Sequence, residues 1–418
     1  MNSIQLPPFL DRKKSDACVH CGLCLQVCPT FLETGNENDS PRGRIHLMRG
    51  LDEVKFPLTE SIADHIDRCL GCRACEAVCP SGVEYGGMLE ATRHAITQHR
   101  KMRLPQQLLQ KVIVERMLTW PNGLRLAVIP ARGMRRLGLT KLLPQRLRKM
   151  VELIPQKPTR FPQAPSSRQE KTEAKVAAGI MSGCVASVFF PGTNQATVAV
   201  AESSGYSVDV DSGSRCCGAI HAHSGNLPEA RKRAQAMIEF FENTEIDIVV
   251  VNAAGCGSTM KEYPQLFNNN SEWKQRADQF SSKVRDVTEI VEYLPISLKK
   301  KRPDHPRTTY HDACHLCHAQ HITEQPRALM QEILGNNFIE LPESDVCCGS
   351  AGSYNITQPE LAQRLGARKA KNIISTGAKV VVTSNIGCIM QIRASLQSAG
   401  AQDIAIIHIA DWTMQAKK

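Results

Sequence analysis

Long apolar runs and aromatic residues are both scarce in this sequence. Phe, Trp and Tyr make up 5% of its 418 residues, and no stretch reaches the roughly 18 uninterrupted apolar residues that a membrane-spanning helix needs. The first residues, MNSIQLPPFLDRKK, carry charges and lack the apolar core of a secretory signal. We therefore expect a cytoplasmic chain, with any membrane contact being peripheral.

Motifs for substrate chemistry are missing as well. No Gly-x-Gly-x-x-Gly follows a predicted strand, and no nucleophile triad is apparent. The formal net charge is +10, but no zinc-finger, helix-turn-helix or RNA-binding signature accompanies it. The sequence thus predicts neither nucleic-acid binding nor oxidation of an organic substrate by this chain alone.

Cysteine, by contrast, is abundant. The chain has 17 cysteines, and in a reducing cytoplasm clustered thiols are more often metal ligands or redox groups than disulfides. Its length and 42% hydrophobic content are enough for two or three domains. Metal or redox chemistry in a multidomain protein is the first expectation.

Composition and periodicity divide the chain into five segments. We predict a ferredoxin-type domain at 1–98, a basic helical connector at 99–154, a Pro- and Ser-rich flexible linker at 155–175, and cysteine-rich modules at 176–300 and 301–418. The predicted fold class is α+β: a small helical, ferredoxin-like two-cluster domain, followed by a duplicated α/β cysteine-rich domain.

The duplication is visible in the spacing of the later cysteines. At offsets of 130, 131 and 132, Cys184 matches Cys314, Cys217 matches Cys348, and Cys256 matches Cys388. The runs IDIVVV and AKVVVTS, both rich in β-branched residues, precede the last cysteine of each copy. We therefore expect the cysteines to lie at strand ends of two α/β modules.

Two copies of C-x2-C-x2-C-x3-C-P lie near the N-terminus. This spacing is typical of a two-cluster ferredoxin, in which the fourth cysteine of each run ligates the other cluster. Zinc also takes four thiolates, but its sites usually use paired C-x2-C knuckles. We predict that one [4Fe–4S] cluster is held by Cys18, Cys21, Cys24 and Cys79, and the other by Cys69, Cys72, Cys75 and Cys28.

The two C-terminal modules supply four further cysteines each. Four thiolates suffice for another cluster, although buried cysteines are also common in inert cores. Adjacent pairs duplicated at matching positions favour a metal or redox site. The candidate ligands are Cys184, Cys216, Cys217 and Cys256, then Cys314, Cys347, Cys348 and Cys388.

A c-type haem motif also occurs in the second module. Cys314, Cys317 and His318 match C-x2-C-H. Covalent haem attachment follows export, for which the sequence has no signal, so we treat the match as coincidental. The roles of Cys317 and of His311, His315 and His318 stay open between iron ligation and ordinary packing.

With these residues in place, the chain resembles the iron–sulfur subunit of glycolate oxidase, also called glycolate dehydrogenase. The stretches that carry the resemblance are CVHCGLCLQVCPTFLETGNENDSPRGRIHLMRG, HIDRCLGCRACEAVCPSGVEYGGMLE, RCCGAIHAHSG, YHDACHL and VCCGSAGSYN. The resemblance implies two flavin-type partner subunits, of which one holds FAD and oxidises glycolate to glyoxylate. It also implies electron transfer toward the respiratory quinone pool and peripheral association with the inner membrane.

The C-terminal modules also resemble the Cys-Cys-Gly domains of heterodisulfide reductase, but the match is incomplete. The runs after Cys256 and Cys388 read GSTM and IMQ, so the additional cysteine of that family is missing in both. The alternatives are the matching subunit of anaerobic glycerol-3-phosphate or lactate dehydrogenase, a heterodisulfide reductase-like enzyme acting through its C-terminal cysteines, or a redox sensor. The flavin partner's substrate would separate the glycolate, glycerol-3-phosphate and lactate subunits from one another, and activity of the isolated chain would identify a heterodisulfide reductase-like enzyme.

Overall fold

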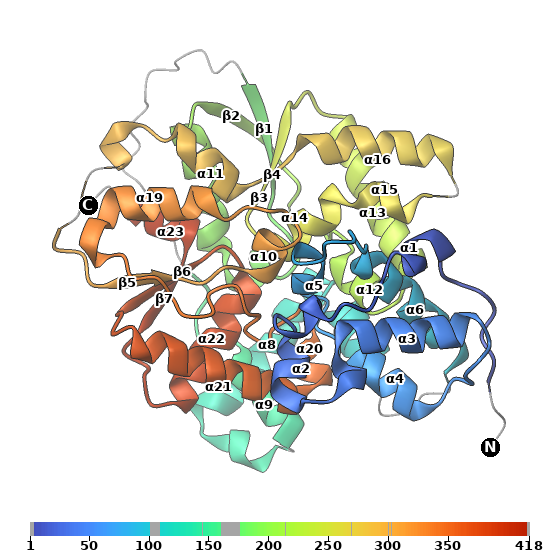
Figure 1. The fold of residues 1–418 in the computed structure, drawn as a ribbon. Coiled ribbons are helices and arrows are strands. Elements are labelled where there is room, and N and C mark those ends of the chain that lie inside the picture. Colours follow the sequence, from blue (N-terminus) through green and yellow to red (C-terminus); the bar gives the residue numbers. More distant parts are fainter. Residues whose placement is uncertain are drawn as a thin grey trace.

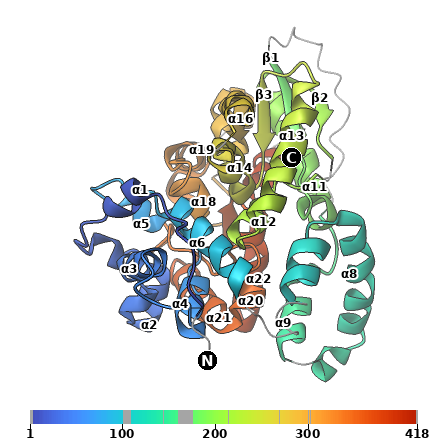
Figure 2. The ribbon, with the colours of Figure 1, turned by 90° about the vertical axis from the view of Figure 1, so that its right-hand side faces the viewer.

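A computed structural model describes residues 4–100, 109–143, 145–159, 176–213, 215–268, 270–299, 301 and 303–415. The N-terminal region packs against one side of two α/β modules, and a helical segment flanks them (Figures 1 and 2). This mixture of helical and α/β parts confirms the predicted α+β class. The predicted segment boundaries stay a prediction, and 160–175 of the predicted linker lie outside the described residues.

The N-terminal region is helical. Thr59 begins α4, because its hydroxyl accepts the Ile62 N–H at 3.2 Å, and Met48, Leu51 and Ile66 are fully buried in the core. Its helices are α1 (Arg12–Asp16), η1 (Leu23–Leu25), α2 (Pro29–Thr34), η2 (Glu37–Asp39), α3 (Pro41–Asp52), α4 (Glu60–Asp67), α5 (Ala74–Ala77) and α6 (Tyr85–His99).

The segment from 109 to 153 is helical too. It contains η3 (Leu109–Met117), α8 (Pro121–Arg136), η4 (Leu139–Leu142) and α9 (Gln145–Leu153). On α8, Leu124 and Val128 are buried against Val188 and Phe189, because they lie four residues apart on one helix face. Figure 2 shows α8 and α9 side by side on one flank of the modules.

The first module has a four-stranded parallel sheet in the order β2-β1-β3-β4. Its strands are β1 (Val176–Met181), β2 (Tyr206–Asp211), β3 (Ile248–Val251) and β4 (Val284–Asp286). Its helices are α10 (Ala186–Phe189), α11 (Pro191–Ser203), α12 (Ala219–His223), α13 (Leu227–Glu242), α14 (Ala254–Lys261), α15 (Tyr263–Leu266), α16 (Ser271–Lys283), α17 (Val287–Ile290), η5 (Val291–Tyr293) and η6 (Ile296–Leu298).

The second module repeats this plan with one strand fewer. Its sheet, β5-β6-β7, is parallel, and the counterpart of β2 is reduced to a single bridge between Thr308 and Phe338. Its strands are β5 (Thr308–Tyr310), β6 (Val380–Thr383) and β7 (Ala405–His408); its helices are α18 (Cys314–Cys317), α19 (Glu324–Leu334), η7 (Gly335–Asn337), α20 (Tyr354–Thr357), α21 (Pro359–Ser375), α22 (Ile386–Ser398) and α23 (Ile409–Met414).

The two modules share one hydrophobic core. Ile180 and Val250 of the first sheet belong to the same buried cluster as Tyr310 and Val382 of the second. A buried hydrogen bond at 2.9 Å also joins the His408 ring to the Asn252 carbonyl. Because every strand pairing is parallel, all strands of a sheet end at the same edge, and these edges carry the cysteines.

Candidate iron–sulfur and cysteine-rich sites

The two N-terminal cysteine loops have the same backbone conformation. In the first, His20 and Gly22 flank Cys21 with φ of 55° and 86°; in the second, Gly71 and Arg73 flank Cys72 with φ of 65° and 64°. Left-handed residues on both sides turn the loop sharply around its middle cysteine. In the second loop the Gly71 N–H donates to the Cys69 thiol at 3.4 Å, a contact of the kind that orients and tunes a metal-bound thiolate.

The structure brings together the first predicted ligand set. Cys18, Cys21, Cys24 and Cys79 line one small cavity, beside Cys75 and Tyr85. Cys79 reaches it from the second run, 55 residues or more after the other three ligands. The fourth cysteine of the second run therefore lies with the first three of the other run.

The second predicted set also comes together, with Cys28 crossing over in the opposite direction. Burial raises the pKa of Cys75, and the neighbouring thiols of Cys72, Cys69 and Cys28 raise it further. Cys28 lies just before α2, and Cys69, Cys72 and Cys28 are all buried. The donor chemistry of both sets fits [4Fe–4S] clusters, whose four irons each take one thiolate.

A buried arginine that the sequence did not single out lies beside the second set. Arg44 is 1% exposed, pairs with Asp39 at 3.6 Å and donates to the His65 carbonyl at 2.7 Å. Burial alone would raise the pKa of Cys69, but Arg44, Arg93 and the Tyr85 hydroxyl together hold it below its usual value. The site therefore favours a thiolate.

Each C-terminal module presents its four cysteines at the carboxyl edge of its sheet. The Cys-Cys-Gly turns are conformational copies, because Gly218 and Gly349 both have φ of +87°. A Cβ added to Gly218 would lie 3.1 Å from the Ala230 carbonyl, and one on Gly349 would lie 2.8 Å from the Ala362 carbonyl. The glycine thus allows the cysteine pair to sit directly against the following helix, α13 or α21.

The thiols follow the same order of contacts in both modules. In the first, Cys216 lies between Cys184 and Cys217; hydrogen bonds from these two lower its pKa well below the usual value. Cys217 in turn contacts Cys256. In the second, the Cys314 and Cys347 sulfurs are 3.9 Å apart, and the remaining contacts run from Cys347 to Cys348 and on to Cys388.

Both sets of thiols line one cavity of about 400 Å³ between the modules. Its other walls are mostly apolar and include side chains of α8 and α9, among them Leu124, Val128 and Met150. A hollow of this size and character can hold a small apolar molecule. The sequence did not predict it, because its walls come from segments more than 200 residues apart.

A histidine completes the donor set in the second module. His311, Cys348 and Cys388 are buried, and their ligand atoms lie within 4.8 Å of one another. Neither ring nitrogen of His311 has a hydrogen-bond partner among the described residues, and burial holds its pKa well below the usual value. A neutral imidazole beside two thiols fits a thiophilic metal.

The other residues of the haem-like motif are engaged elsewhere. The His315 ring contacts the Gly71 carbonyl at 2.8 Å, and the His318 ring contacts the Asp345 carbonyl at 3.1 Å. Cys317 is buried, and its thiol points to the Cys314 carbonyl at 3.7 Å. These contacts are those of packed residues.

The second N-terminal set adjoins the second module. Leu70, Cys72 and Ala74 share a buried cluster with Cys347 and Tyr354, and Cys72 and Cys314 are close enough to raise the pKa of the Cys72 thiol, after the larger effect of burial. Three cysteine groups therefore form a continuous row from the N-terminal loops to the shared cavity.

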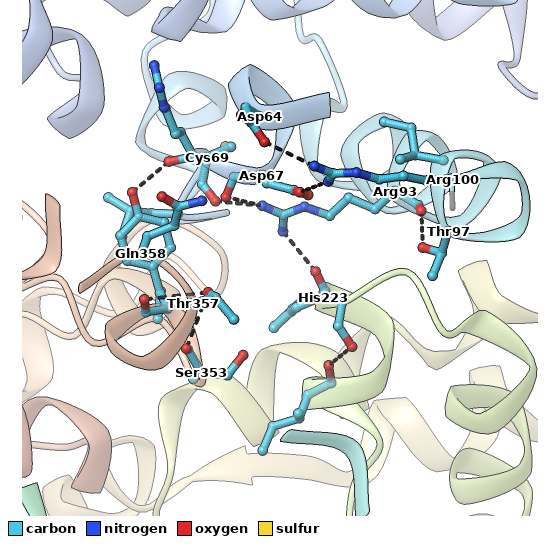
Figure 3. A pocket seen from close by; sticks show the side chains of 18 residues that line it. Asp64, Asp67, Cys69, Arg93, Thr97, Arg100, His223, Ser353, Thr357 and Gln358 are labelled. Atoms are coloured by element: carbon cyan, nitrogen blue, oxygen red, sulfur yellow. Dashed lines mark hydrogen bonds and ion pairs between the residues drawn. The ribbon is translucent and has the colours of Figure 1, made fainter. Parts of the chain in front are cut away.

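Arg93 joins the N-terminal region to the first module. Its guanidinium donates to the Cys69 carbonyl at 2.6 Å and to the His223 carbonyl at 2.8 Å. Figure 3 shows Arg93 between these two residues in a polar pocket, with Arg100 paired to Asp64 and Asp67 nearby. Such long-range contacts cannot be found from spacing, so sequence reasoning missed Arg93 as it missed Arg44.

Among the described residues, no helix is both long and apolar enough to cross a membrane. The family comparisons agree with the cysteine patterns. A 4Fe-4S dicluster domain matches residues 14–83. A cysteine-rich domain matches twice, at 178–261 and 308–393, which confirms the predicted duplication.

Curated relatives match over nearly the whole chain. A probable glycolate oxidase iron-sulfur subunit of Bacillus subtilis (strain 168) is 33% identical over 96% of this chain and 93% of its own length. The glycolate oxidase iron-sulfur subunit of Escherichia coli (strain K12) is 32% identical over 93% of this chain and 91% of its own. Lactate utilization protein A of Oceanobacillus iheyensis is 31% identical but matches 54% of this chain. The chain therefore belongs to the family of glycolate oxidase iron–sulfur subunits.

Proposed function

We propose that this chain is the electron-transfer subunit of a glycolate oxidase complex. It takes electrons from an FAD-binding partner that oxidises glycolate to glyoxylate and passes them toward the respiratory quinone pool. The observation that carries this proposal is the row of three cysteine groups, from the N-terminal loops through Cys72 to Cys314 and Cys347. Electron transfer across a protein needs redox centres placed one after another in space, whereas a site that only binds a substrate does not need such a row.

The N-terminal cysteines would hold two [4Fe–4S] clusters. Such clusters carry one electron each, so they convert the two-electron chemistry of a flavin into single steps. Cys18, Cys21, Cys24 and Cys79 would bind one, and Cys69, Cys72, Cys75 and Cys28 the other. Around the second set, Arg44 supplies positive charge and the Gly71 N–H donates to a thiolate, and both favour the more negative, reduced state.

The C-terminal cysteines would extend the relay as metal ligands or redox thiols. In the heterodisulfide reductase pattern a further cysteine follows three residues after the last one; here Thr259 and Gln391 occupy those places. In the second module, His311 lies beside Cys348 and Cys388 instead. This supports a centre held by thiolates and one imidazole.

The proposal assigns the substrate to the partners. Two flavin-type subunits would bind this chain, and the complex would sit in the cytoplasm, peripherally on the inner membrane. The chain itself would contribute no catalytic residue and bind no nucleic acid. The lactate utilization relatives favour lactate as the second candidate substrate for the flavin partner.

The first test is metal content. Iron and acid-labile sulfide are measured per chain on anaerobically purified protein, beside a variant with Cys184, Cys217, Cys314 and Cys348 changed to Ser. Two cubanes require about eight irons. More than eight irons per chain in the wild type, falling to about eight in the variant, would support metal centres in the C-terminal modules. Eight irons in both proteins would mean that the C-terminal cysteines are free thiols. Fewer than eight in the wild type contradicts the relay.

The second test is reduction by substrate. The chain is assembled with its flavin partners, mixed with glycolate and freeze-quenched for EPR at low temperature. We expect reduced-cluster signals within one turnover, and loss of the second cluster's signal in Cys72→Ser. Signals that appear with lactate and not with glycolate would show that lactate is the substrate of the flavin partner. If the complex oxidises glycolate while the clusters of a chain with full iron content stay oxidised, the proposed electron-transfer function is overturned.

A further inference from the structure

The outer face of the 109–147 segment carries an unusual share of the exposed apolar surface. Of the sixteen large apolar side chains that are exposed in the described chain, eight lie between 112 and 147. Leu126, Ile129 and Leu142 are 66%, 65% and 78% exposed. Leu124 and Val128, on the opposite face of α8, are buried. The helix is therefore apolar on both faces, and the outer face has no covering among the described residues.

The same segment carries most of the net positive charge of the protein. Residues 109–147 contain eight Lys and Arg and one acid, Glu115, a net charge of +7 out of the +10 of the whole chain. Five of these basic residues are exposed and form no ion pair with a described residue: Lys111, Arg116, Arg125, Arg136 and Lys141. The rest of the chain has a net charge of only +3, so the positive charge concentrated in this segment favours an anionic partner.

We propose that this face, from η3 through η4, is a docking surface for an anionic lipid bilayer. Apolar side chains set among cations that form no ion pair with a described residue fit the interface of such a membrane, where the apolar side chains enter the acyl boundary and the cations meet the headgroups. Trp120, half-exposed at the start of α8, has the amphipathic ring that favours this depth. An acidic protein would satisfy the cations but leave the apolar side chains in water.

The cavity that holds the cysteines reaches this face. Leu147 of α9, just beyond η4, lines the cavity and is also 41% exposed. On α8, Leu124 and Val128 line the cavity, while Leu126 and Ile129 lie on the exposed face. The inference rests on the proposed function, because it names the surface by which that relay meets a lipid-dissolved acceptor. Its own evidence is independent of any cluster.

Vesicle flotation of the full anaerobic chain tests the proposal. We expect binding to vesicles of 30% phosphatidylglycerol in phosphatidylcholine, at least tenfold weaker binding to phosphatidylcholine alone, and quenching of Trp120 fluorescence by doxyl-labelled lipid. Trp412 is buried and Trp273 packs against Phe267, so the quenching reports on Trp120.

Two variants and two matched controls locate the surface. Leu126→Ser/Ile129→Ser/Leu142→Ser, and separately Arg125→Glu/Arg136→Glu/Lys141→Glu, should each weaken binding at least tenfold. The controls make the same changes elsewhere on the exposed surface: Val54→Ser/Ile296→Ser/Ile374→Ser and Lys232→Glu/Lys274→Glu/Lys371→Glu. These should change binding less than twofold. Iron content of every variant verifies the fold.

The outcomes separate docking from function. Absence of flotation by the wild type, or equal loss in variants and controls, overturns the docking surface. So does loss of flavin-partner binding in a variant that still floats, because the face would then be a protein interface. Glycolate-dependent reduction of a soluble dye by the complex is read in parallel; its failure with flotation intact would overturn the function and leave the docking surface standing.

Discussion

Arg44 is a cation enclosed in the N-terminal core, where charges are normally absent. Asp39, the Thr30 hydroxyl and the His65 carbonyl hold its guanidinium, and it lowers the pKa of Cys69 against the opposing effect of burial. A charge in a poorly screened interior acts strongly on its neighbours. Arg44 should therefore set the potential of the second cluster as well as the protonation of its ligand.

Replacing Arg44 with Met should make the potential of the second cluster more negative, by about 60 mV or more, a tenfold change in a one-electron equilibrium. The reason is that a nearby positive charge stabilises the reduced state. An EPR-monitored redox titration measures the shift. Asp39 keeps His65 and Arg68 as partners in the variant, so we expect the fold to survive.

Arg42→Met is the control, because Arg42 is partly exposed and paired with Glu37 near the first cysteine set. It should leave the second cluster's potential unchanged. Equal shifts in both variants, or none in Arg44→Met at full iron content, would contradict the role of Arg44.

At this scale the sequence predicted the donors but not their surroundings. The donors could be predicted because the cysteine spacing is a property of a local loop. The structure brings each predicted set together, and the role of these cysteines as cluster ligands stays a prediction. Arg44 and Arg93 act through contacts made by tertiary folding, which also brings His311, whose role the sequence left open, beside Cys348 and Cys388. In the sequence Arg44 is one of 51 Lys and Arg, and nothing local distinguishes it.

Among the secondary-structure elements, the Cys-Cys-Gly turn is the repeated device. Each turn places two thiols at a sheet edge and lets the next helix pack against the glycine. Gly349 is tighter than Gly218, with 2.8 Å against 3.1 Å to the nearest carbonyl for an added Cβ. The second module should therefore be less tolerant of a side chain here.

Gly349→Ala should destabilise the second module by roughly 2–4 kcal/mol, the range of strain plus a displaced helix. Gly400→Ala is the matched control: its φ is +74°, and an added Cβ there meets nothing within 4 Å. Gly400→Ala should therefore lower the free energy of unfolding by only about 1 kcal/mol, the cost of the left-handed backbone conformation for alanine. Differential scanning calorimetry of the anaerobic protein compares the two, and equal losses would contradict the packing argument.

Element prediction succeeded where the signal is local. The runs IDIVVV and AKVVVTS, which precede Cys256 and Cys388, contain β3 and β6. The sequence did not reveal that the copy of β2 shrinks to one bridge at Phe338. Whether a short extended segment pairs as a strand depends on its neighbour in the sheet, which its own residues do not specify.

At the scale of the whole molecule, the two modules that arise from the sequence repeat enclose one cavity between them. The cysteines of both modules face it, and α8 and α9 cover it. Duplication alone would suggest two equal sites, one per copy. The sequence could not predict their fusion, because it depends on how the modules pack through their common core.

The intact chain should accordingly bind one molecule of an apolar quinone, such as decylubiquinone, and not two. Equilibrium dialysis on anaerobic protein measures the stoichiometry. Val128→Trp should abolish binding, because Val128 lines the cavity, whereas Leu126→Trp on the exposed face of the same helix should retain it. Two molecules per chain, or equal loss in both variants, would contradict a single shared site.

The burial of the second cysteine set has a consequence for the assembly of the protein. Cys28, Cys69 and Cys72 are at most 9% exposed, and Cys72 lies beneath Cys347 and Tyr354 of the second module. A protein that delivers iron and sulfide cannot reach these thiols once the halves have docked. Cys21, by contrast, remains exposed. We therefore expect the proposed inner cluster to be installed on the newly made N-terminal half before the modules close over it, whereas the proposed outer cluster should remain open to repair afterwards.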